Sequence, residues 1–123
     1  MPNSKQNPLD PALDSMKDFF KASKKSASAI LKMRQDIIFS EGILSSKIKA
    51  AMALVWSISA KCDPCLKYYA VKAKEMGLTE EELGELLAVG STMGGCVGEM
   101  WCLKAYHAFK HADELTEACC EVH

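Results

Sequence analysis

The strongest chemical signal in the chain is the motif Cys62-Asp-Pro-Cys65. Asp63 as N-cap and Pro64 as the first helical residue predict that a helix begins inside the motif. The positive end of the helix macrodipole, together with nearby lysines, favours an anionic sulfur there and lowers the thiol pKa. Two thiols three residues apart are also close enough for a disulfide to form and break. The motif therefore indicates either a redox-active dithiol or half of a zinc site, which often uses the same CxxC spacing.

Metal binding needs more ligands than the motif supplies, and the rest of the chain offers them only weakly. Cys96 and Cys102 are six residues apart, which turns them about 240° from each other around a helix. His107 and His111 form an i, i+4 pair that could clamp a metal, although a pair on a solvated helix is usually surface. Cys119, Cys120 and His123 lie in a terminal tail. Metal binding thus ranks second, and its candidate ligands are Cys62, Cys65, Cys96, Cys102, His107 and His111.

Other side chains could support a redox pair. Tyr69 follows Cys65 by four residues, so its hydroxyl could reach a sulfur or a bound peroxide, or its ring could simply fill the core. Glu99, Cys102 and Tyr106 form a stripe on the last predicted helix. If this stripe packs over the motif, Glu99 could orient water or accept a proton. Cys102 could equally be an apolar filler, as buried cysteines commonly are.

The pattern of apolar residues, caps and breakers predicts an all-α fold of about five to six helices. Prolines make residues 1–13 a loose lead-in, and residues 14–123 are expected to form one domain. The predicted helices run from about 14 to 38 with a serine-rich break at 23–28, from just after Ser45 or Ser46 to about 60, from Pro64 to just before Gly77, from the Thr79 cap to about 90, and from about 96 to at least 111, with a flexible joint at 93–95.

Composition and charge exclude several classes of function. The formal net charge of −1 supplies no general basic field for nucleic acid. The longest apolar run, residues 50–60, is well short of the ~20 residues of a membrane span. The N-terminus lacks the apolar region of a secretory signal. We therefore expect a soluble, cytoplasmic protein in which six cysteines serve redox or metal chemistry rather than a disulfide framework.

Two patterns point to self-association. The helix predicted to end at residue 60 is apolar around nearly its whole circumference, more than a chain of this length can bury by itself. Charge is also divided between the two parts of the chain. Residues 1–74 carry 13 basic and 6 acidic groups, whereas residues 75–123 carry 2 and 10. These opposite charges could let subunits pack head to tail, or could reflect only solvated helix faces.

Four segments in order resemble one family. They are Leu44-Ser-Ser-Lys-Ile-Lys-Ala-Ala-Met-Ala-Leu54, Cys62-Asp-Pro-Cys65, Gly77-Leu-Thr-Glu-Glu-Glu-Leu-Gly-Glu-Leu-Leu-Ala-Val89 and Met93-Gly-Gly95. Over about residues 40–110 this pattern is similar to the carboxymuconolactone decarboxylase superfamily, in its CxxC-containing alkylhydroperoxidase D branch. The resemblance implies an all-helical subunit of an obligate homo-oligomer, a trimer or a hexamer. It also implies Cys62 and Cys65 as catalytic residues, a hydroperoxide or protein disulfide as substrate, a thiol protein as electron donor, and no cofactor.

The chain departs from the family pattern at two positions. Peroxidase members place a Glu twelve residues before the first Cys and a His four residues after the second, and these two form a proton relay. This chain has Ala50 and Tyr69 there. By resemblance, Cys65 is the sulfur nearest the relay position and Cys62 is its disulfide partner. Three interpretations stay open, namely a thiol–disulfide oxidoreductase or weak peroxidase, a metal-binding protein, and a non-catalytic redox sensor, while lactone decarboxylation is disfavoured because that branch generally lacks the CxxC.

Overall fold

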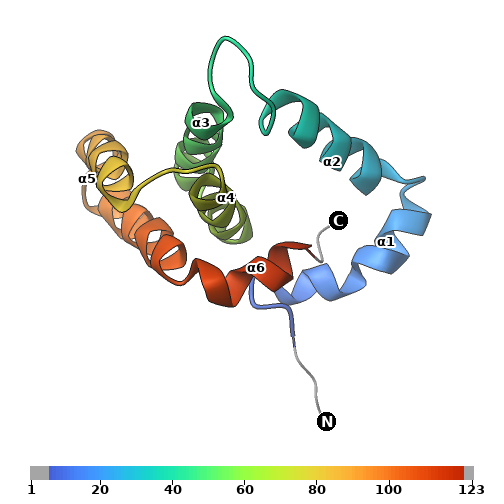
Figure 1. Ribbon diagram of the computed structural model, residues 1–123. Coiled ribbons are helices and arrows are strands. Elements are labelled where there is room, and N and C mark those ends of the chain that lie inside the picture. The colour runs from blue at the N-terminus through green and yellow to red at the C-terminus, as the bar shows by residue number, and fades with distance from the viewer. Residues whose placement is uncertain (1–5, 121–123) are drawn as a thin grey trace.

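The computed structural model describes residues 6–120, with side chains described as far as residue 116, and this part of the chain contains helices and no strands. Figure 1 shows α3 and α4 packed side by side at the centre, with α5 on one side and α1 and α2 on the other. The elements are a 3₁₀ helix at Pro11–Ser15 and the helices α1 (Met16–Ala22), α2 (Ser26–Ile37), α3 (Ser46–Ser59), α4 (Asp63–Glu75), α5 (Glu80–Lys110) and α6 (Ala112–Cys120).

Most predicted helices are confirmed. The serine-rich break separates α1 from α2, and the side chain of Ser45 caps α3 by accepting the Ile48 N–H. The core lies where α3, α4 and α5 meet. Its fully buried members repeat at helical spacing, which is the pattern that defines an amphipathic helix; they include Ala50, Leu54, Leu66, Ala70, Ala73, Leu83 and Ala105.

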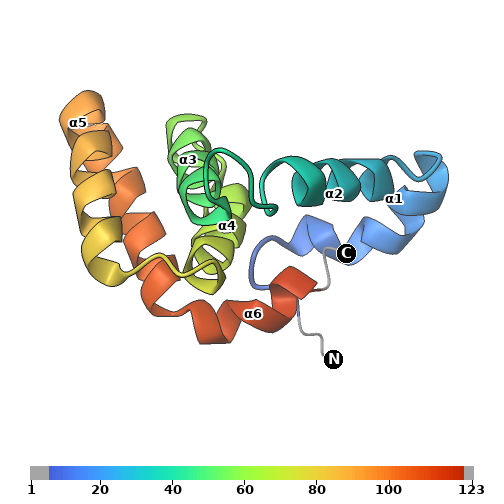
Figure 2. The same cartoon turned by 45° about the horizontal axis from the view of Figure 1, so that its top comes forward.

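Helix α5 is a hairpin of two limbs. Gly95 has φ +63° and ψ −150°, a backbone conformation open essentially to glycine alone. The first limb (residues 80–94) and the second limb (residues 96–110) lie side by side (Figure 2). The joint predicted at 93–95 is therefore present, but the preceding helix does not end at Gly90. Gly90 and Gly98 lie at the crossing of the limbs, where a Cβ on Gly98 would stand 3.2 Å from the Gly90 carbonyl.

The C-terminal helix also differs from the prediction. It breaks at His111 (φ −108°, ψ 29°), and α6 continues beyond that break as a separate helix. Taken together, the two limbs of α5 are long and apolar enough to cross a membrane, by length and composition only. Each limb alone is shorter than the ~20 residues that a span requires. This arrangement is compatible with the soluble protein that the sequence predicts.

A capping box fixes the start of α5. The Thr79 hydroxyl accepts the Glu82 N–H, and the Glu82 carboxylate accepts the Thr79 N–H. Lys47 on α3 donates to the same carboxylate at 2.8 Å, which ties the first limb to α3. The hydrogen bonds from Lys47 and from the Thr79 backbone lower the pKa of Glu82 below its ordinary value.

Acid is expected to weaken this junction. A carboxyl whose pKa is lowered by folding stabilises the protein above its unfolded pKa, and that contribution is lost as the pH falls through the folded pKa. We expect Glu82→Gln to lower the melting temperature at pH 7 and to show a smaller drop than the parent between pH 5 and pH 3. Circular dichroism melts measure both effects. Glu85→Gln, on the same limb but outside the capping box, is the matched control, and equal acid sensitivity of parent and Glu82→Gln contradicts this account.

Candidate functional site

Cys62 and Cys65 form a disulfide across the start of α4, with their Cα atoms 5.2 Å apart. A tight turn after α3 positions the two cysteines. In this turn Lys61 adopts the left-handed conformation (φ +57°), and the Cys62 N–H donates to the Ser57 carbonyl. Both cysteines are half-buried. Cys65 stands in the first helical turn, where backbone N–H groups lack intrahelical acceptors and the macrodipole favours negative charge.

The helix starts one residue earlier than predicted. Cys62 is the N-cap, with an extended backbone (φ −96°, ψ 101°), and Asp63 is the first helical residue. The Asp63 carboxylate does not cap the helix, because it forms ion pairs instead. Its partners are Lys67 on the next turn, at 2.8 Å, and Lys104 on the second limb of α5, at 3.8 Å. The residue between the two thiols thus links the motif to α5 and brings two ammonium groups close to it.

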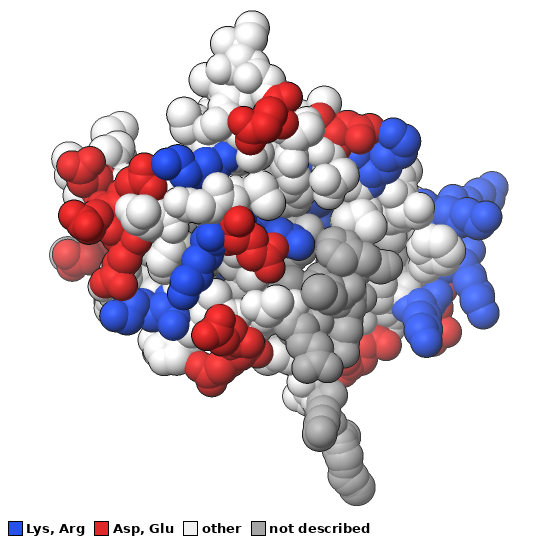
Figure 3. All heavy atoms as spheres, in the orientation of Figure 1, with Lys and Arg blue, Asp and Glu red and all other residues white. Residues whose placement is uncertain are grey.

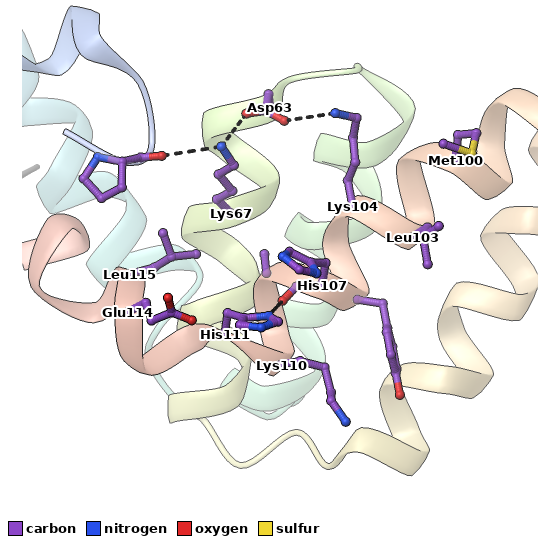
Figure 4. A pocket seen from close by; sticks show the side chains of 13 residues that line it. Asp63, Lys67, Met100, Leu103, Lys104, His107, Lys110, His111, Glu114 and Leu115 are labelled. Atoms are coloured by element: carbon purple, nitrogen blue, oxygen red, sulfur yellow. Dashed lines mark hydrogen bonds and ion pairs between the residues drawn. The ribbon is translucent and has the colours of Figure 1, made fainter. Parts of the chain in front are cut away.

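A hollow of about 1050 Å³ opens beside the motif between α4 and the second limb (Figure 4). Asp63, Lys67 and Lys104 meet at one end of it, and His107 and His111 line another part. Met100, Leu103, Ala108 and Leu115 form an apolar part of its lining, and the rest comes from Pro8, Tyr106, Lys110 and Glu114. A molecule held here would lie next to the residue that separates the cysteines.

Local sequence signals did not identify Lys104 as part of this site. It is 41 positions along the chain from Asp63, an ordinary exposed lysine on a helix. It reaches the motif only because Gly95 folds the second limb back toward α4. The charge division along the chain was the single available hint, since Lys104 is one of only two basic residues in the acidic C-terminal part.

Tyr69 lies one turn along α4 from Cys65 and is half-buried among aromatic rings. Its ring meets that of Tyr68 edge-on at 5.0 Å between centroids and lies 6.2 Å from that of Phe39. Tyr69 also packs against the core cluster that contains Ala50. The two positions that depart from the family pattern therefore border the same packed region. The contacts of Tyr69 with the neighbouring rings favour a packing role, and direct participation at sulfur stays a prediction.

The stripe of Glu99, Cys102 and Tyr106 faces the first limb of α5. The three side chains line a small groove together with residues of that limb. The Tyr106 hydroxyl donates to the Glu80 carboxylate at 2.6 Å, which raises the pKa of Tyr106 and lowers that of Glu80. Glu99 is exposed. The proposed role of Glu99 required the stripe to cover the cysteines, and this arrangement gives that role no support.

Cys102 is a core residue at the crossing of the two limbs. It is buried, and its sulfur fills the space above Gly90, where an added Cβ would stand only 2.9 Å from Sγ. This close fit is typical of a cysteine that acts as a small apolar filler. It also makes the packing at this point testable by a pair of substitutions.

Gly90→Ala is expected to destabilise the parent but to stabilise a Cys102→Ala background. In the parent, the methyl group meets the buried sulfur, and overpacking costs about 1–3 kcal/mol. Without the sulfur, only the helix-forming advantage of alanine is left, about 0.5–1 kcal/mol. Urea unfolding of the parent, the two single variants and the double variant measures the free energies of unfolding in this double-mutant cycle. Gly84→Ala, whose added Cβ would meet no atom within 4 Å, should stabilise both backgrounds. The same sign in both backgrounds for Gly90→Ala would show that Cys102 does not set the packing here.

The candidate metal ligands are not brought together in the described part of the chain. No group of three or more His, Cys, Asp or Glu side chains there could hold a metal ion. Cys96 is exposed near the hairpin turn, whereas Cys102 is buried. The centroids of the His107 and His111 rings lie 4.1 Å apart with the ring planes tilted by 31°, and His111 Nδ1 lies 2.9 Å from the His107 carbonyl oxygen. The side chains of Cys119, Cys120 and His123 lie outside the described residues.

Comparisons with known proteins agree with this fold. An uncharacterised protein of Cupriavidus necator is 32% identical over 69 residues, which cover 56% of this chain and 61% of that protein's length. The structure is similar to that of the apo form of a carboxymuconolactone decarboxylase family protein from Legionella pneumophila. The TM-score is 0.72 and the identity 23%, over 81% of this chain and 88% of that one. A family model matches residues 24–108, more than half of the sequence, and the chain therefore belongs to the carboxymuconolactone decarboxylase family.

Proposed function

We propose that the protein is a thiol–disulfide oxidoreductase of the alkylhydroperoxidase type, with Cys62 and Cys65 as its redox pair. The observation that carries the proposal is the disulfide itself, which sits at a helix start and is half-buried rather than sealed in the core. Structural disulfides are uncommon in reducing compartments, and a bond across one helix start constrains little of the fold. Its placement suits a bond that opens and closes.

Cys65 is the attacking residue in this proposal. Its sulfur belongs to the first turn of α4, where the helix macrodipole favours the negative charge of a thiolate once the disulfide is reduced. Lys67 and Lys104 offset the carboxylate of Asp63, the one acidic group inside the motif, which would otherwise oppose a thiolate. Cys62 stands at the N-cap, within disulfide distance, and serves as the resolving residue.

The Cys65 thiolate attacks the outer oxygen of a hydroperoxide, the O–O bond breaks, and the alcohol leaves after taking up a proton. The resulting sulfenic acid is attacked by the Cys62 sulfur, which forms the disulfide and releases water. A dithiol protein then reduces the disulfide through a mixed disulfide. The hollow beside Asp63 gives either an organic hydroperoxide or a loop of a partner protein a place to bind.

Peroxide turnover by the reduced protein is the direct test. Freshly reduced protein is mixed with cumene hydroperoxide, with dithiothreitol as donor, and the loss of peroxide is followed while peptide mass spectrometry monitors the Cys62–Cys65 disulfide. We expect consumption together with disulfide formation. Cys96→Ser, which removes the exposed free thiol outside the pair, should behave like the parent. A disulfide that forms without turnover selects the redox-sensor interpretation. If the protein neither consumes peroxide nor forms the disulfide, the peroxidase proposal is wrong.

The protein is also proposed to work as a homo-oligomer, a trimer or a hexamer, in the cytoplasm. The support is the outer side of α3, where Ile48, Met52 and Trp56 are exposed by 47%, 58% and 69% of their surfaces. Their i, i+4, i+8 spacing makes one continuous apolar stripe. A stripe of this kind, on a helix whose opposite face is buried in the core, marks a contact surface for another chain.

A further inference from the structure

Residues 16–37, which comprise α1, α2 and the turn between them, form an arm that stands away from the helical body. Figures 1 and 2 both show the arm and α5 on opposite sides of α3 and α4. No residue of α1 or α2 is buried. Ordering the backbone costs about 1–2 kcal/mol per residue, and isolated helices shorter than ~12–15 residues are marginal in water. The arm therefore needs a surface to cover it.

The arm carries an apolar stripe of its own. Ile30, Met33 and Ile37 repeat at i, i+3 and i+7 on α2, and they expose 44%, 59% and 62% of their surfaces. The end of the arm that rejoins the body is in contact with it. There the Arg34 guanidinium lies 5.4 Å from the centroid of the Tyr68 ring, and Phe39 packs on the core just beyond α2. The stripe itself is left open.

A groove of matching character lies on the far side of the body, between α3 and the first limb of α5. Its volume is about 580 Å³, and nearly all of its lining is apolar. We call it the α3–α5 groove; it is lined by Lys47, Ile48, Ala51, Met52, Val55, Trp56, Ser59, Leu78, Glu82 and Leu86. It contains the exposed α3 stripe. Two apolar stripes at helical spacing are what helix-on-helix packing requires.

The charges of the two surfaces are opposite. The arm has six basic and two acidic residues, whereas the first limb, which forms one wall of the groove, has four acidic residues and no basic one. Figure 3 shows blue side chains at the right edge of the molecule, over the arm, and red ones at the left edge, over α5. The arm cannot reach the groove of its own chain, because α3 and α4 stand between them.

We propose that the arm of one copy packs into the α3–α5 groove of a second copy. This inference rests on the assembly proposed above and adds its contact surfaces. Donor and acceptor surfaces lie at opposite ends of one subunit, so the contact is head to tail. Head-to-tail contacts that close generate rings, which agrees with a trimer or a pair of trimers.

The first test places a charge in the stripe of the full-length chain. Met33→Asp should raise the dissociation constant of the assembly by about 100-fold or more, because a buried interface residue is replaced by an unpaired carboxylate. Sedimentation velocity over a range of concentrations measures it, and circular dichroism checks helix content. Ile43→Asp is the matched control, since Ile43 is a fully exposed aliphatic residue in the loop between the arm and α3. It should assemble like the parent.

Charge reversal and cross-linking identify the surfaces. Lys17→Glu with Lys21→Glu, and separately Glu81→Lys with Glu85→Lys, should each weaken the assembly by about tenfold, and the four changes together should restore it. Carbodiimide coupling of a mixture of ¹⁴N- and ¹⁵N-labelled protein should join arm lysines to Glu81 or Glu85 in peptides of mixed label. These readouts do not depend on redox activity.

Three results would overturn the inference. An assembly that tolerates both Met33→Asp and the charge reversals shows that subunits meet through other surfaces, although the proposed oligomer itself stands. Cross-links confined to singly labelled peptides show that the arm is covered by its own chain. A parent protein that stays monomeric at all concentrations removes the oligomer as well, without bearing on the peroxidase assay.

Discussion

Cys65→Ser is expected to reduce hydroperoxide consumption by about 10³-fold or more, to the rate of the dithiol donor alone. The residue supplies the nucleophile in the proposed cycle, and losses of this size are usual when a nucleophile is removed. Serine keeps the volume and the helix start, so the fold and the ion pairs of Asp63 should persist. Peroxide consumption at saturating donor, with circular dichroism to verify folding, measures the effect.

Cys62→Ser is expected to give a different failure. The variant should complete one attack and then stop, because the sulfenic acid on Cys65 has lost its resolving thiol. Dimedone should label Cys65 in this variant after peroxide is added, and it should label nothing in Cys65→Ser. If Cys65→Ser is labelled by dimedone and Cys62→Ser is not, the attacking residue is Cys62, the N-cap, instead of Cys65. If both variants keep the parent rate, the redox pair is not the site of peroxide chemistry.

The sequence predicted the parts of this site that depend on local spacing. A CxxC motif whose two middle residues are Asp and Pro predicts both a helix start and a disulfide between its cysteines, and both are present. The sequence predicts the cap one residue too late, because aspartate is a common N-cap and Asp63 could accept backbone N–H groups. Its carboxylate instead faces two lysines, and one of these comes from a distant helix. Side-chain partners of that kind depend on tertiary packing, which no local pattern encodes.

The difference between local signals and tertiary contacts also explains which parts of the fold could be predicted. Ser45 and Thr79 are strong N-caps with short-range partners, so α3 and α5 begin where expected. From the sequence alone, Gly90 favours a helix end, because glycine weakens helices. Its real use is to let the second limb approach, since a Cβ there would collide with Cys102. A joint at Gly95 was predictable from composition, but its effect was not, because folding the limbs together depends on contacts between residues far apart in the chain.

Restoring the proton relay is expected to have the second large effect on the rate of peroxide consumption. By resemblance, the family's relay uses a Glu and a His where this chain has Ala50 and Tyr69. Ala50 is fully buried, and Tyr69 packs against the same cluster. A Glu alone at position 50 would be a buried carboxylate without a cationic partner, which is costly. A His at position 69 could supply that partner, so the two substitutions are expected to be better tolerated together than Ala50→Glu alone.

The double variant Ala50→Glu with Tyr69→His is expected to raise the rate of peroxide consumption by about 10²–10⁴-fold, the usual contribution of general acid–base catalysis. The pH dependence of the rate should show an additional ionisation near neutral pH, because the new histidine now acts as the base that deprotonates the thiol. Ala50→Gln with Tyr69→His keeps the volume and removes the carboxylate, so its gain should be much smaller. A folded double variant with the parent rate and profile would mean that more than the relay separates this chain from the peroxidases. The CxxC would then be better explained as a slow redox switch, because its helix start and two lysines still favour a thiolate without a base to speed its turnover.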